Sequence, residues 1–376
     1  MRRVLPPGVG PEHVKLAKKL GAVKVMGPPL CDELLALVAH LFTRDEARIG
    51  LHLSFVRSRT ADDLARKTGI RPQELAALLE EMCRKRVILG GAQRYRLYPL
   101  LPGTFENILR TGEGSPWHRR YAELINELVD TGYLREYFTR PVPAIRSIPI
   151  QQTVEDKTVV VDSDLVSEMI DSHTDFAMLH TCPCRQSMHL TGHGCKRASP
   201  ADGCLTFGKY SLGIVANGNG RAVSKSEMRD IVVERAEKQL VFFTSNAVPT
   251  LQTAICTCCD CCCHALGIIN GLGGKLAAPP HFLAAVDEAR CTHCGRCVAA
   301  CNTHAHAMLD RRHVYDAARC LGCGLCVAAC GEQAIDLVEN EHYRPPSPTY
   351  RKLILKLLRP VVRTGLGIKL RRYFSR

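Results

Sequence analysis

Hydrophobic positions recur every three to four residues between residues 30 and 84, which is the spacing of helices that bury one face. The first stripe consists of Leu34, Leu35, Leu37, Val38 and Leu41. Thr43, with Glu46 three residues later, forms a capping box and predicts the start of a second helix. Thr60 is placed to cap a helical turn over 61–67, and Pro72 to open a helix over 73–84.

Two short apolar runs follow, Val87-Ile88-Leu89 and Tyr95-Arg96-Leu97-Tyr98, and the Gly90-Gly91 pair between them predicts a β-hairpin. Helix–turn–helix followed by a hairpin resembles a winged-helix domain, which we expect over residues 30–112. DNA binding is one hypothesis for it. The helix that would enter the groove carries Glu74, Glu80 and Glu81, which face phosphates unfavourably, so a protein-interaction module is favoured.

The segments on either side are predicted to be less regular. Residues 1–29 are basic and rich in Pro and Gly, which indicates a loosely ordered leader with a short helix over Pro11–Leu20. Residues 113–150 are predicted to form a helical connector that ends at Pro141 and Pro143, with Trp117 as a packing residue.

The middle of the chain, residues 151–280, mixes both periodicities. A β-branched run at 158–161 predicts a strand, and 163–170 predicts a helix. Ser224 with Glu227 forms a capping box at the start of a helix that reaches Leu240. With a further, cysteine-rich domain expected at 281–340, the chain is predicted to be an α+β multidomain protein.

The last segment, residues 341–376, follows a proline break and is amphipathic. Leu353, Leu357 and Val361 share one helical face, with basic residues on the others, and Pro360 is expected to interrupt the helix, as are the glycines Gly365 and Gly367. Such a segment lies on an anionic membrane, docks an acidic partner or packs against its own protein, and the pattern leaves these three open.

The formal net charge of +13 is concentrated at the two ends of the chain. Residues 1–29 carry +5 and residues 342–376 carry +10, which leaves −2 for residues 30–341. An acidic body argues against general nucleic-acid binding, so nucleic acid is not an expected partner. The N-terminus lacks the apolar core of a secretory signal and no apolar run reaches membrane-span length, so a reducing cytoplasm is expected, with peripheral membrane contact through the basic tail left open.

Cysteine spacing carries the strongest chemical signal. Of the 20 cysteines, two tandem runs follow C-x2-C-x2-C-x3-C: Cys291, Cys294, Cys297 and Cys301, then Cys320, Cys323, Cys326 and Cys330. Three close thiolates suit three corners of one [4Fe–4S] cluster, and the fourth suits the neighbouring cluster. We therefore expect one set of Cys291, Cys294, Cys297 and Cys330, and another of Cys320, Cys323, Cys326 and Cys301. Two zinc sites are the alternative, although zinc pairs are usually separated by longer loops.

Residues 288–338 resemble a bacterial-type ferredoxin with two [4Fe–4S] clusters. They share both cysteine runs and the apolar segment after the second run, up to Leu337. The family usually places proline after the fourth cysteine, where this chain has Asn302 and Gly331. We expect that difference to change N–H···S bonding and the reduction potential, without removing a ligand.

Ten further cysteines lie in the middle segment, enough for two four-thiolate sites with two left over. They are Cys182, Cys184, Cys195, Cys204, Cys256, Cys258, Cys259, Cys261, Cys262 and Cys263. The first four could form one site alone, or they could meet the 256–263 group in space and share clusters with it. The spacing of the cysteines does not distinguish these two arrangements. One or two additional Fe–S clusters are favoured over a structural zinc or over redox-active thiols.

Three polar residues beside these cysteines are candidates for supporting roles. Arg185 follows Cys184 directly and is expected to offset cluster charge. His193 and His264 are candidate ligands, although ordinary hydrogen-bonding histidines are the favoured interpretation. A cluster with only three cysteine ligands would leave an iron open to substrate.

Residues 30–340 as a whole resemble a family of uncharacterised iron–sulfur proteins from anaerobic microbes. The resemblance rests on the C-x-C-R segment at Cys182–Arg185, on Gly192–Cys195, Cys204 and Cys256–Cys263, and on the ferredoxin runs. The resemblance implies iron–sulfur binding and a redox function, and it does not identify a substrate. The glycine stretches near 218 and 273 lack the spacing of a nucleotide-binding loop.

These observations predict an iron–sulfur electron-transfer protein with redox proteins as partners, no assigned small-molecule substrate and no catalytic side chain. Whether it is also an enzyme stays open. One alternative is a redox-sensing winged-helix regulator, and another is a reductase with an open-iron cluster in the middle segment.

Overall fold

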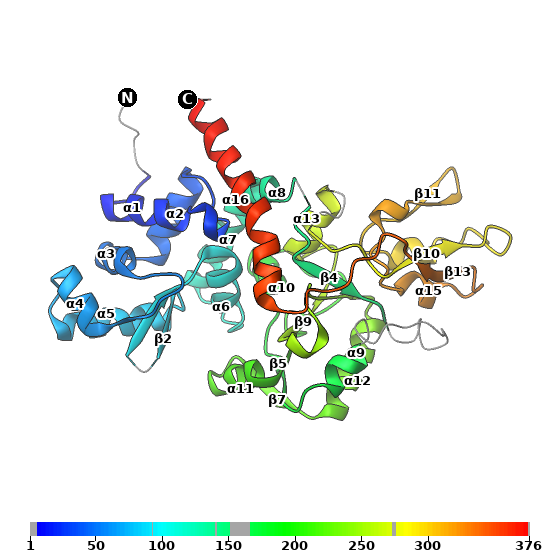
Figure 1. Cartoon of the computed structure of the whole chain (residues 1–376), viewed down its shortest axis with the longest axis horizontal. Coiled ribbons are helices and arrows are strands. Elements are labelled where there is room, and N and C mark those ends of the chain that lie inside the picture. The colour runs from blue at the N-terminus through cyan, green and yellow to red at the C-terminus, as the bar shows by residue number, and fades with distance from the viewer. Residues whose placement is uncertain (1–5, 92, 140, 151–165, 273–275, 375–376) are drawn as a thin grey trace. The chain divides into compact units, whose positions relative to one another are not determined.

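The structure is a computed structural model that describes residues 6–91, 93–139, 141–150, 166–272 and 276–374 (Figure 1). The chain divides into two compact units. The first comprises Met1–Tyr137, Gln186–His193 and Val361–Arg376, and the second comprises Phe138–Arg185 and Gly194–Pro360. The strand predicted at 158–161 lies outside the described residues.

The first unit is mainly helical. Its helices are α1 (Pro11–Leu20), α2 (Asp32–Leu41), α3 (Arg44–His52), α4 (Ala61–Thr68), α5 (Pro72–Arg84), α6 (Phe105–Leu109), α7 (Pro116–Asp130) and α8 (Tyr133–Tyr137). The Thr43–Glu46 capping box is present, and Thr60 accepts a hydrogen bond from the Asp63 N–H, as the sequence predicts. Every member of the Leu34–Leu41 stripe is buried.

The leader is more ordered than we expect from its composition. Helix α1 has the predicted bounds, but Leu16 and Leu20 are fully buried and Leu16 lies against Gly50 of α3. The Nζ of Lys19 also donates to the carbonyl oxygen of Leu51 at 2.7 Å. Helix α1 of the leader is therefore part of the first unit's core, because its apolar face outweighs the Pro and Gly content of the segment.

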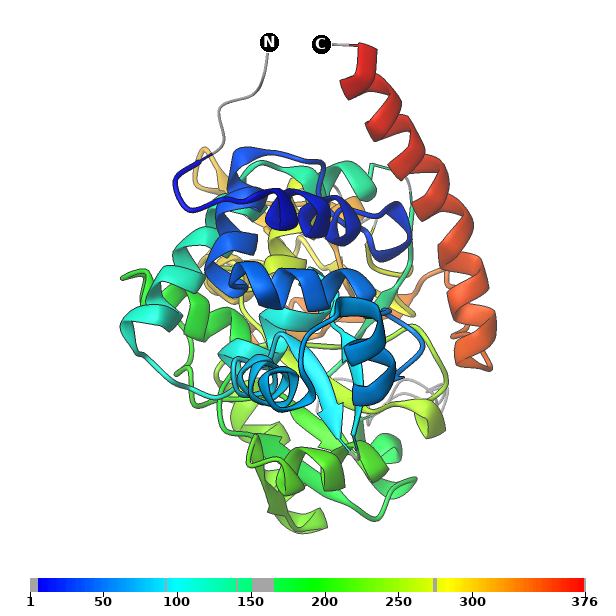
Figure 2. The ribbon, with the colours of Figure 1, turned by 90° about the vertical axis from the view of Figure 1, so that its left-hand side faces the viewer.

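A small sheet completes the first unit. Strands β1 (Arg59–Thr60), β2 (Ile88–Gly91) and β3 (Arg94–Leu97) pair in the order β1-β3-β2, all antiparallel. The two predicted runs form the β2–β3 hairpin, which lies beside α5 (Figure 2). The predicted turn position is wrong, because Gly90 and Gly91 belong to β2 and pair with Tyr95 and Arg94. The order of elements is thus helix, strand, two helices and a hairpin.

The second unit is built on a six-stranded antiparallel sheet. Its strands are β4 (Ile145–Ile148), β5 (Phe176–Leu179), β6 (Leu205–Phe207), β7 (Gly220–Val223), β8 (Val241–Ser245) and β9 (Ala254–Cys258), in the order β4-β8-β9-β6-β5-β7. The helices that lie wholly in this unit are α9 (Val166–Asp171), α11 (Gly208–Ala216), α12 (Lys225–Glu237) and α13 (His264–Leu272). Helix α10 (Pro183–Leu190) begins in this unit, and its residues from Gln186 onward belong to the first unit. The side chain of Ser224 caps α12, as predicted.

The C-terminal part of this unit has an internal repeat. Strand β10 (Phe282–Val286) pairs with β13 (Ile335–Glu339), and β11 (His306–Leu309) pairs with β12 (Arg312–Tyr315). Short helices α14 (Arg296–Ala300) and α15 (Leu325–Ala329) follow glycines in the left-handed conformation, Gly295 at φ 77° and Gly324 at φ 79°. Glycine adopts this conformation without the steric cost that other residues meet, so both halves make the same turn.

The chain ends in the long helix α16 (Tyr350–Phe374). The expected break at Pro360 and Gly365 is wrong, since the helix continues through both, at the cost of the N–H that proline lacks. Leu353 and Val361 of the predicted stripe are buried, while Ile354, Leu355 and Leu358 are exposed. Among the helices that the structure describes, none is both long and apolar enough to cross a membrane.

Candidate metal centres

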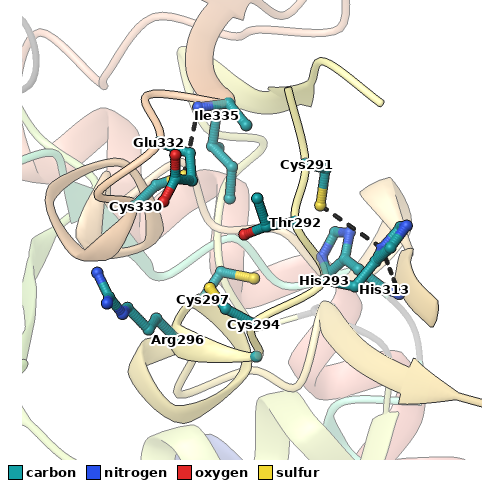
Figure 3. Close-up of a pocket in the computed structure, with 12 residues that line it drawn as sticks. Cys291, Thr292, His293, Cys294, Arg296, Cys297, His313, Cys330, Glu332 and Ile335 are labelled. Atoms are coloured by element: carbon teal, nitrogen blue, oxygen red, sulfur yellow. Dashed lines mark hydrogen bonds between the residues drawn. The ribbon is translucent and has the colours of Figure 1, made fainter. Parts of the chain in front are cut away.

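Two cavities in the C-terminal part of the second unit each gather four thiols. The first is lined by Cys291, Cys294, Cys297 and Cys330 (Figure 3). The second is lined by Cys301, Cys320, Cys323 and Cys326. Each cavity takes three cysteines from one run and the last cysteine of the other, which is the crossed grouping that the spacing predicts.

The two fourth cysteines have equivalent surroundings. The backbone N–H of Ala305 donates to the Sγ of Cys301, and that of Ala334 donates to the Sγ of Cys330, both at 3.3 Å. In each case the donor lies four residues after the acceptor. Hydrogen bonds from backbone N–H groups to cysteine sulfur are among the contacts that tune an iron–sulfur cluster.

A histidine pair connects the linings of the two cavities. His313 lines the first and His306 the second, with 2.8 Å between His306 Nδ1 and His313 Nε2. Burial, followed by the nearness of His313, lowers the pKa of His306 to about 4, so that ring is neutral at pH 7. The spacing of residues 306 and 313 gives no sign of this pair, because the β11–β12 register brings them together.

The residues around the first cavity fit an anionic iron–sulfur cluster. The Nδ1 of His313 is buried and has no hydrogen-bond partner among the described atoms, so it is available to a group inside the cavity. Arg296 brings a positive charge to the same lining. A four-thiolate cluster carries net negative charge, which such donors and cations stabilise.

The ten middle cysteines separate into a group of four and a group of six. We call the first the four-thiol group: it consists of Cys195, Cys259, Cys261 and Cys262, whose sulfur atoms all lie within 4.8 Å of one another. The Sγ of Cys195 is 3.6 Å from those of Cys259 and Cys261, and the Sγ of Cys261 is 3.6 Å from that of Cys262.

The other six cysteines form a closed ring, which we call the six-thiol ring. Neighbours around it are joined by side-chain hydrogen bonds in the order Cys182, Cys184, Cys263, Cys258, Cys256, Cys204 and back to Cys182. The pKa values alternate, since hydrogen bonds from neighbouring thiols lower those of Cys182, Cys256 and Cys263, and raise those of Cys184, Cys204 and Cys258.

Sheet topology explains why four of these six thiols meet. Strands β5, β6 and β9 are neighbours in the sheet. Cys182 follows β5, Cys204 precedes β6, and Cys256 and Cys258 lie two residues apart on one side of β9. Of the two arrangements that the spacing leaves open, the structure therefore favours the one in which both cysteine segments meet, and it separates Cys195 from Cys182, Cys184 and Cys204.

Arg185 is buried beside both groups, with 1% of its surface exposed. It donates to the carbonyl oxygens of Asp202 at 2.8 Å and Thr257 at 2.6 Å, and it forms a side-chain hydrogen bond with Cys259. Arg185 therefore lies beside cysteines of both groups, and the charge-offsetting role expected for it stays a prediction. His193 is exposed and hydrogen-bonds with Thr191, so it is no part of either group.

The comparisons with known proteins concern one part of the chain. Residues 290–334 match the family model described as a 4Fe-4S dicluster domain. No curated protein and no solved structure matches the chain, so the expected resemblance of residues 30–340 as a whole is without support. The C-terminal part of the chain is therefore similar to a ferredoxin, with iron–sulfur binding and electron transfer as its indicated role.

Proposed function

We propose that this protein is an iron–sulfur electron-transfer protein whose C-terminal domain holds two [4Fe–4S] clusters in crossed ligand sets. One set is Cys291, Cys294, Cys297 and Cys330, and the other is Cys320, Cys323, Cys326 and Cys301. The observation that carries the proposal is the pair of cavities, each closed by three cysteines of one run and one of the other. When bound, the clusters supply single-electron exchange without a proton step.

The two cavities differ in how far their cysteine loops are exposed. Around the first, Cys294 is exposed. Around the second, Leu321 and Gly324 are buried on either side of Cys323. This second loop is also tied to the segment after β4, because the N–H of Ile150 donates to the carbonyl oxygen of Cys323 at 3.0 Å. We propose that electrons enter at the exposed first cluster and pass through the second toward the interior of the unit.

The six-thiol ring extends this proposal into the middle segment. Six thiolates exceed the four that one cubane binds, so the ring suits a site with more than one metal ion. Cys182, Cys258 and Cys263 of the ring are buried, and Cys182 lies near the buried Arg185, which provides the positive charge that an anionic cluster requires. We therefore propose an additional Fe–S site there, continuing the path that begins in the ferredoxin-like domain.

For the first unit we propose a winged-helix-like fold that serves protein interaction. The order α3, β1, α4, α5 and the β2–β3 hairpin supports this fold. The acidic character of α5 argues against DNA, since Glu74 is exposed and Glu81 pairs with Arg84 at 2.6 Å. Redox proteins are the proposed partners.

Metal analysis of the full chain, purified without oxygen, tests the proposal. About 8 iron per chain corresponds to the two ferredoxin clusters alone, and about 12 or more adds an Fe–S site at the six-thiol ring. Reduction with dithionite should give the electron paramagnetic resonance signal of two interacting [4Fe–4S]⁺ clusters. Fewer than about 4 iron with intact protein would contradict the proposal.

A further inference from the structure

We propose that the four-thiol group of Cys195, Cys259, Cys261 and Cys262 binds one zinc ion in a closed tetrahedral site. The proposal goes beyond the electron-transfer function, because this site is separate from the ferredoxin clusters and from the six-thiol ring. Zinc has no redox chemistry, so its role here is structural.

The spacing of the sulfur atoms carries the inference. Four sulfurs at about 2.3 Å from one ion in a tetrahedron stand about 3.8 Å from one another. Three of the six sulfur–sulfur distances in the group are 3.6 Å, and all six are within 4.8 Å. The four thiols are thus already arranged as the ligands of a single ion.

The same spacing excludes a cubane cluster at this position. A [4Fe–4S] cluster places each cysteine on a different iron, so its four thiolates stand farther apart than ligands of one ion. Within the described part of the chain, neither ferredoxin set forms a group in which all sulfurs lie within 4.8 Å. The sulfur atoms of the four-thiol group are therefore closer together than those of the expected cluster sites.

Charge around the group suits a zinc ion with four thiolates, which together carry about −2. The backbone N–H of Lys196 donates to the Sγ of Cys261 at 3.4 Å, and the buried Arg185 forms a hydrogen bond with Cys259. The Nε of Arg185 has no partner among the described atoms. These donors stabilise the thiolate form that zinc requires.

The loop between Cys259 and Cys262 is held in place by contacts that need no metal. The N–H of Asp260 donates to the Oδ1 of Asn302 at 3.1 Å, and the Nε of Arg197 pairs with the Asp260 carboxylate at 2.9 Å. Arg197 also donates to the carbonyl oxygen of Ala299 at 2.9 Å. With four protein ligands and no open position, the zinc would join this loop to the segment that carries Cys195.

Substitution of one cysteine from each group tests the assignment in the full chain. After anaerobic purification the wild type should hold about one zinc per chain. Cys195→Ala should lose that zinc and keep the ferredoxin iron and its resonance signal, whereas Cys204→Ala, from the six-thiol ring, should keep the zinc. Cys83→Ala, in the first unit, is the control and should keep every metal.

X-ray absorption at the zinc edge tests the same site without a variant, in case Cys195→Ala does not fold. Four sulfur neighbours at about 2.3 Å are expected. Nitrogen or oxygen ligands, equal zinc loss in Cys195→Ala and Cys204→Ala, or iron in place of zinc at this site would each overturn the proposal. None of these results changes the ferredoxin signal, so a failure here is distinguishable from a failure of the electron-transfer function.

Discussion

The side-chain oxygen of Asn302 accepts a hydrogen bond from the backbone N–H of Asp260 at 3.1 Å. Asn302 directly follows Cys301, a proposed ligand of the second ferredoxin cluster, and Asp260 lies between Cys259 and Cys261 of the four-thiol group. The Nδ2 of Asn302 donates to the carbonyl oxygen of Gln239 at 2.9 Å. Asn302 therefore connects the ferredoxin-like segment to the cysteine-rich one. A proline, which bacterial-type ferredoxins usually have at this position, has no side-chain donor or acceptor for these bonds.

Removing the hydrogen bonds of Asn302 should lower the stability of the second unit. Asn302→Ala removes the hydrogen-bond partner of the Asp260 N–H and of the Gln239 carbonyl oxygen. The free energy of unfolding should therefore fall by about 2–3 kcal/mol. Denaturant unfolding, followed by loss of cluster absorbance, measures the change. Gly331→Ala is the matched control, because Gly331 holds the equivalent position after Cys330 and is exposed. Equal stability of the two variants would contradict the role of Asn302.

Crossed ligation makes a prediction about Cys330. Although Cys330 belongs to the second run, Cys330→Ala should damage the first cluster and so behave like Cys294→Ala. Cys323→Ala should damage the second cluster instead. The measurement is the midpoint potential and resonance signal of the cluster that remains in each variant. If Cys330→Ala matched Cys323→Ala, the crossed assignment would be wrong.

Arg185 should matter for metal retention as well as for folding. Arg185→Gln removes a buried charge that donates to Thr257 and Asp202, which costs about 3 kcal/mol or more. It also removes the cation beside Cys259, so zinc should leave faster in a chelator-competition assay. Arg197→Gln is the comparison for the second effect, since Arg197 contacts Asp260, Gln239 and Ala299 rather than a thiol. Unchanged zinc release in Arg185→Gln would argue against its electrostatic role.

The single tryptophan offers a local probe of pH in the first unit. Trp117 stacks on His40 with 4.9 Å between ring centroids, and burial lowers the pKa of His40 below its ordinary value. A lowered pKa means that the unfolded chain takes up the proton first, so stability is full above about pH 6.5 and falls as the pH drops through the window below it.

Fluorescence should report this titration directly. A protonated imidazole quenches a stacked indole, so Trp117 emission should fall on acidification with a midpoint below about 6.5. His40→Gln should remove most of the change. His118 also lies against Trp117, with its pKa lowered by burial, so His118→Gln is the control that should retain it. A midpoint at or above the ordinary histidine value would contradict the burial of His40.

Local patterns in the sequence determined much of this protein. The capping residues Thr43, Thr60 and Ser224 predicted three helix starts, because a cap depends on residues three positions apart. The crossed grouping of the ferredoxin cysteines also followed from spacing, since a three-cysteine loop is too short to reach all four corners of its own cluster. Both kinds of prediction need only a short stretch of chain.

Tertiary structure decided the rest. The division of ten middle cysteines into four and six depends on the β9-β6-β5 strand order, which joins residues as far apart in sequence as Cys204 and Cys256. The burial of α1 likewise depends on a distant residue, since the buried Leu16 lies against Gly50 of α3, a contact that local propensity does not show. The spacing of the middle cysteines gives their number, but it does not show that the Sγ of Cys195 lies 3.6 Å from that of Cys259, because that contact depends on the folded backbone.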